Sequence, residues 1–122
     1  MVSAMTIFQG LRADLSPPEL ASLRAAVREH YEHLLHAQEQ NELIAIDLAE
    51  LLRDRLDQLL AMAHQLALEA RLDIVGAARY FVEDQDLIPD EKSCTGLDDD
   101  VLVFNHVARS LGRSDLVIED RA

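Results

Sequence analysis

The sequence at residues 16–35 reads SPPELASLRAAVREHYEHLL. The Ser16 hydroxyl can accept a hydrogen bond from a free helix amide, proline is tolerated in a first helical turn, and Glu19 suits a capping box. Apolar side chains then recur at intervals of three and four residues, at Leu20, Leu23, Val27, Tyr31, Leu34 and Leu35. This spacing predicts a helix that begins near Pro17 and ends in the polar cluster at 38–41.

Residues 42–70 predict a second, longer helix, because their apolar positions cover more than a narrow stripe. Four acidic residues keep one face of it polar and solvated: Asp47, Glu50, Asp54 and Asp57. An unbroken continuation through Phe81 would be about 60 Å long at 1.5 Å per residue, too long for a domain of this size to cover. We therefore expect a break at 71–73 with Asp73 as the N-cap of a third helix. Gly76 inside that helix indicates close approach of a neighbouring helix.

An acidic segment follows the third predicted helix. Residues 83–100 hold eight acidic residues and a single lysine. Pro89 stops any helix there, and Gly96 adds turn character. The helical period resumes at Leu97, and the fourth helix is expected to end by Gly112, a good C-terminal cap.

These elements predict an all-α fold. Few β-branched residues alternate with polar ones, so a sheet has little support. We expect a small four-helix bundle over residues 16–113, with the acidic loop between its third and fourth helices. Residues 1–15 form either an apolar arm or a short helix, and residues 114–122 form a C-terminal tail.

Composition limits the classes of function. A chain of 122 residues with 49% apolar residues is the size of one domain and has enough apolar material for a core. Its formal net charge of −12 argues against a nucleic-acid partner, because phosphate binding needs a basic face. There is no run of 18 apolar residues, no signal-peptide pattern and only one cysteine, Cys94, so we expect a cytoplasmic protein.

The candidate site lies in the acidic segment. It consists of four aspartates: Asp86, Asp90, Asp98 and Asp99. Pro89 and Gly96 could shape the loop so that these carboxylates meet, and close carboxylates either raise a pKa or bind a divalent cation. Capping of turns and of the fourth helix is the favoured interpretation, and a cation site or an acidic edge that docks a protein are the alternatives. No cofactor is expected beyond that cation.

A family resemblance rests on the same segment. Tyr80 is followed by DLIPD at residues 86–90, by GLDD at residues 96–99 and by an apolar helix. Over residues 80–109 this signature resembles the YkvA-like family, which comprises small helical bacterial domains of unknown function that also occur in larger proteins, including a ubiquitin ligase. The resemblance implies a helical domain without an assigned catalytic activity. Family members usually carry an apolar, proline-containing stretch where this chain has polar residues at 91–95, so membrane association is not expected.

Two other groups of residues invite chemical interpretations. His30, His33 and His36 follow one another at steps of three, which fans them across about 120° of a helix. We interpret them as a solvated face, with a transition-metal site as the alternative if another element supplies a ligand. Cys94 lies among carboxylates that would raise its pKa, which argues against a nucleophilic thiol.

The sequence therefore predicts an interaction or scaffold module rather than an enzyme. The breadth of the apolar face at 42–70 suggests that the chain self-associates or binds another protein. The alternative function is a divalent-cation-binding protein or a metal-dependent hydrolase that uses the four aspartates as ligands.

Overall fold

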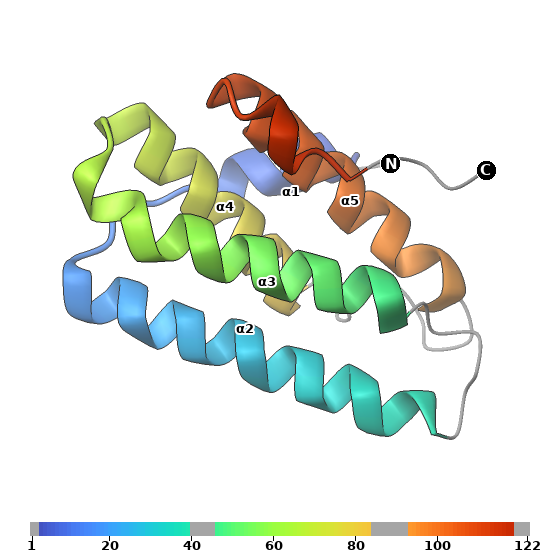
Figure 1. The fold of residues 1–122 in the computed structure, drawn as a ribbon. Helices are drawn as coiled ribbons and strands as arrows, with labels where there is room; N and C mark the ends of the chain where they lie inside the picture. The colour runs from blue at the N-terminus through green and yellow to red at the C-terminus, as the bar shows by residue number, and fades with distance from the viewer. Residues whose placement is uncertain (1–2, 40–45, 84–92, 119–122) are drawn as a thin grey trace.

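The computed structural model describes residues 3–39, 46–83 and 93–118. These residues form five α-helices and two short 3₁₀ turns, and none of them lies in a strand, so the predicted all-α class is confirmed (Figure 1). The elements are α1 (Ala4–Leu11), α2 (Pro17–Gln38), α3 (Ile46–Met62), η1 (Ala63–Gln65), α4 (Leu68–Glu83), α5 (Ser93–Ser110) and η4 (Ser114–Leu116). The predicted count of four main helices is exceeded because the N-terminal segment contains a helix of its own. None of the described helices combines the length and hydropathy needed for a membrane span.

Helix α2 begins as predicted. The Glu19 backbone N–H donates to Ser16 Oγ at 3.4 Å, and the Ser16 backbone N–H donates to Glu19 Oε1 at 2.9 Å. These two bonds complete the capping box and satisfy amides that a helix start leaves free. The Ser16 backbone N–H and the Ser16 hydroxyl both donate to Glu19 Oε1 at 2.9 Å, and these two bonds lower the pKa of the Glu19 carboxyl because they favour its charged form.

The break between α3 and α4 lies earlier than predicted. Helix α3 ends at Met62 and α4 begins at Leu68, so the chain turns at 63–67 and the predicted break at 71–73 is wrong. The turn is closed by hydrogen bonds: the Leu66 N–H donates to the Ala63 carbonyl, and Arg71 Nη1 donates to the Leu66 carbonyl at 2.8 Å. Asp73 is consequently not an N-cap and lies inside α4.

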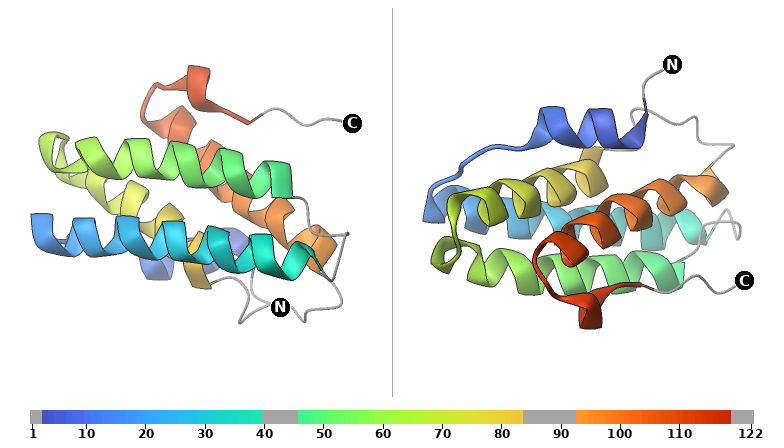
Figure 2. Two further views of the ribbon diagram at one scale, coloured as in Figure 1. Left: turned by 60° about the horizontal axis from the view of Figure 1, so that its bottom comes forward. Right: turned by 90° about the horizontal axis from the view of Figure 1, so that it is seen from above.

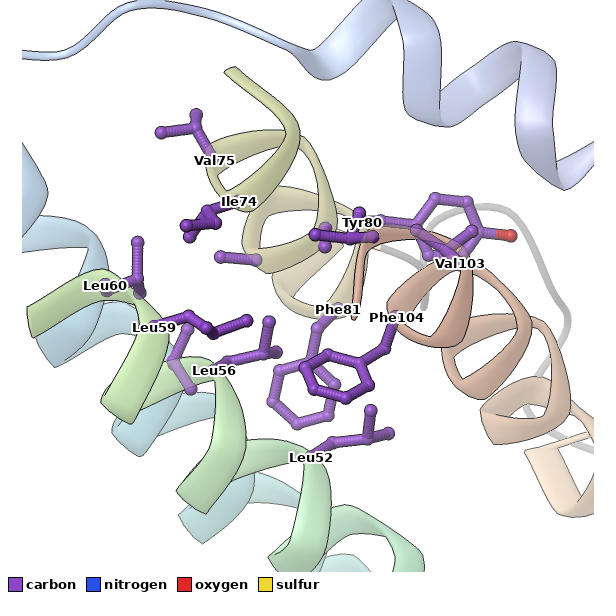
Figure 3. Close-up of a cluster of buried hydrophobic side chains, with 14 of the residues drawn as sticks. Leu52, Leu56, Leu59, Leu60, Ile74, Val75, Tyr80, Phe81, Val103 and Phe104 are labelled. Atoms are coloured by element: carbon purple, nitrogen blue, oxygen red, sulfur yellow. The ribbon is translucent and has the colours of Figure 1, made fainter. Parts of the chain in front are cut away.

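The hydrophobic core gathers around α3. Figure 3 shows leucines of α3 directed toward side chains of α4 and α5: Leu52, Leu56 and Leu59 face Ile74, Phe81 and Phe104. Helix α3 contacts α2, α4 and α5, and its five most buried side chains have almost no exposed surface. The wide apolar face that suggested self-association is therefore covered largely within the same chain.

Helix α1 packs on α4 at the expected glycine. The Phe8 side chain is 0% exposed, and a Cβ added to Gly76 would lie 2.8 Å from Phe8 Cε1 and 2.9 Å from Arg12 Cγ. These distances are shorter than carbon atoms tolerate, so only glycine lets α1 approach this closely. The close approach that Gly76 indicated is confirmed, and the neighbouring helix is α1.

Polar contacts fix the end of α1 to α4. Arg12 Nε donates to Asp73 Oδ1 at 2.7 Å, and Arg12 Nη2 donates to Glu69 Oε1 at 2.9 Å. Arg79 Nη1 of α4 donates to the Leu11 carbonyl, which the end of α1 leaves without a helical partner. The alternatives left open for residues 1–15 are thus resolved in favour of a docked short helix.

Two glycine substitutions test this packing. Gly76→Ala is expected to lower the free energy of unfolding by about 1 kcal/mol, because overpacking costs about 1–3 kcal/mol and the higher helix propensity of alanine recovers about 1 kcal/mol. Gly10→Ala in α1 is the matched control, since nothing lies within 4 Å of its added Cβ. It is expected to stabilise the protein by up to about 1 kcal/mol. Urea unfolding measures both; equal stabilisation by the two substitutions would contradict the packing.

Helix α5 begins four residues earlier than predicted. It starts at Ser93, so Gly96, expected to shape the loop, lies in the helix instead. Its end is as predicted: Gly112 adopts φ 73°, the Gly112 N–H donates to the Arg109 carbonyl, and the Arg113 N–H donates to the Ala108 carbonyl. This pair of bonds is a Schellman motif, which glycine favours because it has no Cβ.

The C-terminal tail folds back onto the bundle. Figure 2 shows it turning from the end of α5 toward α3. Leu116 and Ile118 are 7% and 4% exposed and belong to the hydrophobic core. The tail is therefore part of the packed structure as far as residue 118.

Candidate functional site

The four aspartates of the predicted site are only partly placed. Asp98 is exposed and Asp99 half-buried in the second turn of α5. Asp86 and Asp90, like Pro89, lie outside the described residues. Because α5 begins at Ser93 and has no acidic residue in its first turn, capping of this helix by Asp98 or Asp99 is wrong.

The described side chains do not assemble a metal site. No group of three histidine, cysteine, aspartate or glutamate residues in 3–39, 46–83 and 93–118 is placed to hold an ion. The predicted cation site at Asp86, Asp90, Asp98 and Asp99 involves residues beyond these ranges and stays a prediction.

The three histidines of α2 do not share a solvated face. His33 and His36 are exposed, but His30 is only 4% exposed and packs edge-on against Phe81, with ring centroids 4.8 Å apart. Burial, reinforced by the charge of His33, lowers the pKa of His30 to about 4. His30 is therefore a neutral core residue at pH 7, and the solvated-face interpretation is wrong for it.

A hollow of about 330 Å³ lies on the polar flank where α2 and α3 meet. We call it the polar hollow, and its lining residues are Arg28, Glu32, Arg53, Asp54 and Asp57. The two helices lie side by side (Figure 2). Ion pairs from Arg24 and Arg28 of α2 to Asp57 of α3 bring their charged flanks into contact. The polar hollow is thus the place where charged side chains from two elements converge.

Asp57 lies at the centre of the ion pairs of the polar hollow. Its Oδ1 accepts from Arg24 Nε at 2.9 Å and from Arg28 Nη2 at 3.3 Å, and its Oδ2 accepts from Arg24 Nη2. The bonds from Arg24 are the main reason that the pKa of the Asp57 carboxyl is lowered. Asp57 is therefore a half-buried, paired carboxylate and not part of the solvated stripe predicted for α3.

Arg53, which also lines the polar hollow, is likewise held by carboxylates. Its Nη2 donates to Asp54 Oδ1 at 2.7 Å and lies 3.8 Å from Glu50 Oε2. The guanidinium also lies over the Tyr31 ring, 4.2 Å from its centroid. The hydrogen bonds that Arg53 donates to Asp54 raise the pKa of Arg53, so the group stays charged and carboxylate-bound.

Glu32 is the carboxylate of the polar hollow that has no basic partner within the described part of the chain. With the adjoining Arg24 and Glu50 included, three arginines face four carboxylates. An anion would have to compete with Asp57 and Asp54 for arginines that they already bind. The polar hollow is therefore suited to a cationic group, such as an ammonium or guanidinium.

Sequence reasoning did not identify the polar hollow. Arg24 and Arg28 are one helical turn apart on α2, and Asp54 and Asp57 are three residues apart on α3. These matching charges could have signalled that the two flanks face each other. The signal requires knowing that α2 and α3 are neighbours, which spacing within one helix does not show.

Comparison of the chain with models of protein families, with curated proteins and with solved structures finds no match. The resemblance of residues 80–109 to the YkvA-like family accordingly rests on the quoted residues and stays a prediction.

Proposed function

We propose that the chain is a helical interaction module, a role compatible with its resemblance to the YkvA-like family, and that the polar hollow receives a lysine or arginine side chain of a partner protein. The observation that carries this proposal is the distribution of charge in the polar hollow. Its arginines are bound by Asp54 and Asp57, whereas Glu32 has no basic partner in the described chain. The formal net charge of −12 favours the same kind of partner, because it attracts basic surfaces over a distance.

The affinity for one side chain is expected to be weak. Exposed ion pairs contribute about 0.2–1 kcal/mol, so a single anchor serves specificity and orientation more than affinity. A stable complex needs an interface of roughly 1,200 Å² or more, to which the polar hollow would contribute one contact.

Titration with N-acetyl-arginine amide, followed by NMR, tests the proposal. The probe should shift the side-chain signals of Arg28 and Arg53 saturably, and Glu32→Gln should weaken binding about 1.4- to fivefold, the range expected for an exposed ion pair. Glu29→Gln is the matched control, since it removes one negative charge from the same helix outside the polar hollow. Equal weakening by both variants, or tighter binding of N-acetyl-aspartate amide, would count against the proposal.

The nature of the partner requires a separate measurement. Light scattering of the chain across a dilution series shows whether a second copy supplies the basic side chain. A monomer at all concentrations would leave another protein as the partner.

A further inference from the structure

The tail is held by a contact that recognises backbone rather than side chain. Asn105 Nδ2 donates to the Ile118 carbonyl at 2.9 Å, and the Ile118 N–H donates to Asn105 Oδ1 at 2.8 Å. One carboxamide thus satisfies both backbone groups of one residue, as a neighbouring strand would. Any residue other than proline could offer the same two groups, so these two bonds recognise the backbone and not a particular side chain.

The side chains on either side supply the apolar part of the contact. Leu116 and Ile118 are both buried, and Val117 between them is half-buried. Arg55 Nη1 of α3 donates to the Leu116 carbonyl at 3.1 Å. The tail therefore presents two apolar anchors two positions apart: Leu116 at the end of the 3₁₀ turn η4, and Ile118 after it.

The tail covers a surface that we call the tail-docking surface. It consists of the parts of α3 and α5 that carry Arg55 and Asn105, together with the core surface under Leu116 and Ile118. Its combination of backbone hydrogen bonds with apolar anchors is the chemistry by which proteins bind peptide segments. The tail reaches it through Gly112, which ends α5. Chain ends are where local opening without unfolding of the helices concentrates.

We propose that the tail-docking surface is a peptide-binding site, that the chain's own residues 114–118 cover it, and that a segment of a partner protein with the same conformation displaces them. The segment carries two apolar side chains two positions apart, because the tail that fits the surface has this pattern. The proposal rests on the proposed interaction role but not on the polar hollow, since the two surfaces share no residue.

Because the tail covers the tail-docking surface, it lowers the apparent affinity of this surface for a partner. The tail is attached to the surface it fills, so it competes at a high effective concentration. A free peptide binds only the fraction of molecules whose tail is open, and its apparent affinity is reduced by that fraction. Undocking the tail should therefore strengthen peptide binding, which is the opposite of what loss of a purely structural segment would do.

A labelled peptide with the sequence RSDLVI, residues 113–118, tests this in the full chain. Ile118→Asp in the chain should undock the tail and raise the apparent affinity for the peptide at least about tenfold over the wild type. Adding Asn105→Leu to Ile118→Asp should abolish that gain, because the backbone of the peptide loses both bonds. A peptide ending in aspartate instead of isoleucine is the matched control and should not bind.

Hydrogen exchange of the wild-type chain provides an independent measurement. The Ile118 amide should exchange faster than the amide of Val107, which lies within α5, because the tail opens locally. Exchange of both amides only through global unfolding would overturn the proposal, as would a folded Ile118→Asp chain that binds the peptide no better than wild type. Failure of the wild-type chain to bind N-acetyl-arginine amide would instead contradict only the polar hollow.

Discussion

Replacing Phe8 by alanine is expected to lower the free energy of unfolding by about 3–5 kcal/mol, the range found for buried aromatic residues. The ring is 0% exposed, lies against Gly76 and meets the His106 ring edge-on at 5.8 Å. Helix α1 has only eight residues, too few to be stable alone, so it depends on this anchor. Urea unfolding followed by circular dichroism measures the change.

Ile7→Ala is the matched control for Phe8→Ala. Ile7 is the neighbouring residue on α1 and is only partly buried, so its truncation should cost about 1 kcal/mol or less. If the N-terminal segment rested loosely on the bundle, the two substitutions would have similar small effects. The amide protection of α4 near Gly76 should also fall in Phe8→Ala, because its covering helix is released.

Acidification should destabilise the protein through His30. Its pKa of about 4 in the folded state lies below the ordinary value of 6.5, so protonation favours the unfolded state. The stability that neutral His30 provides is fully present above pH 6.5, is lost as the pH falls toward 4, and amounts to on the order of 3 kcal/mol. About 2 kcal/mol of this should disappear between pH 7 and pH 5.

The slope of the free energy of unfolding against pH shows whether His30 is the group that titrates. His30→Phe removes the titrating group, so the loss between pH 7 and pH 5 should largely vanish whatever the stability of the variant at pH 7. His33→Gln, on the exposed side of the same helix, should keep most of the slope. Glu19 and Asp57 do not interfere, because their pKa values are lowered from 4.5 and 3.8 and their protonation falls below this window. A slope that survives His30→Phe would show that another group titrates.

The parts of the fold that sequence predicted are those with a local chemical cause. The capping box of Ser16 and Glu19 and the C-terminal cap at Gly112 depend on a few adjacent residues, and both were predicted at the correct positions. Gly76 was assigned to a close approach because glycine is unfavourable inside a helix. Which helix would approach it, however, could not be predicted, since Phe8 lies far away in the chain.

The errors arise where tertiary contacts override local signals. The turn at 63–67 contains neither glycine nor proline, and the bond from Arg71 to the Leu66 carbonyl helps to close it. His30 has a polar side chain whose burial follows from Phe81 on another helix. Gly96 was read as a loop residue because glycine marks turns more often than helix interiors.

The candidate site was less predictable than the fold. Sequence reasoning favoured aspartates that are adjacent in a conspicuous acidic segment, of which the structure describes Asp98 and Asp99. The polar hollow and the tail-docking surface each combine residues from two elements. In the sequence, for example, Asn105 is only a polar residue among apolar neighbours, and its role is evident only from the position of Ile118.

The docking of α1 on α4 has a consequence for folding of the chain during its synthesis. Arg12 is bonded to Asp73, 61 residues further along the chain. At the ribosomal rate of about 5–20 residues per second, roughly 3–12 s pass between the synthesis of these two residues. The apolar side of the first helix therefore emerges from the ribosome well before its binding surface exists, and during this interval it is accessible to chaperones.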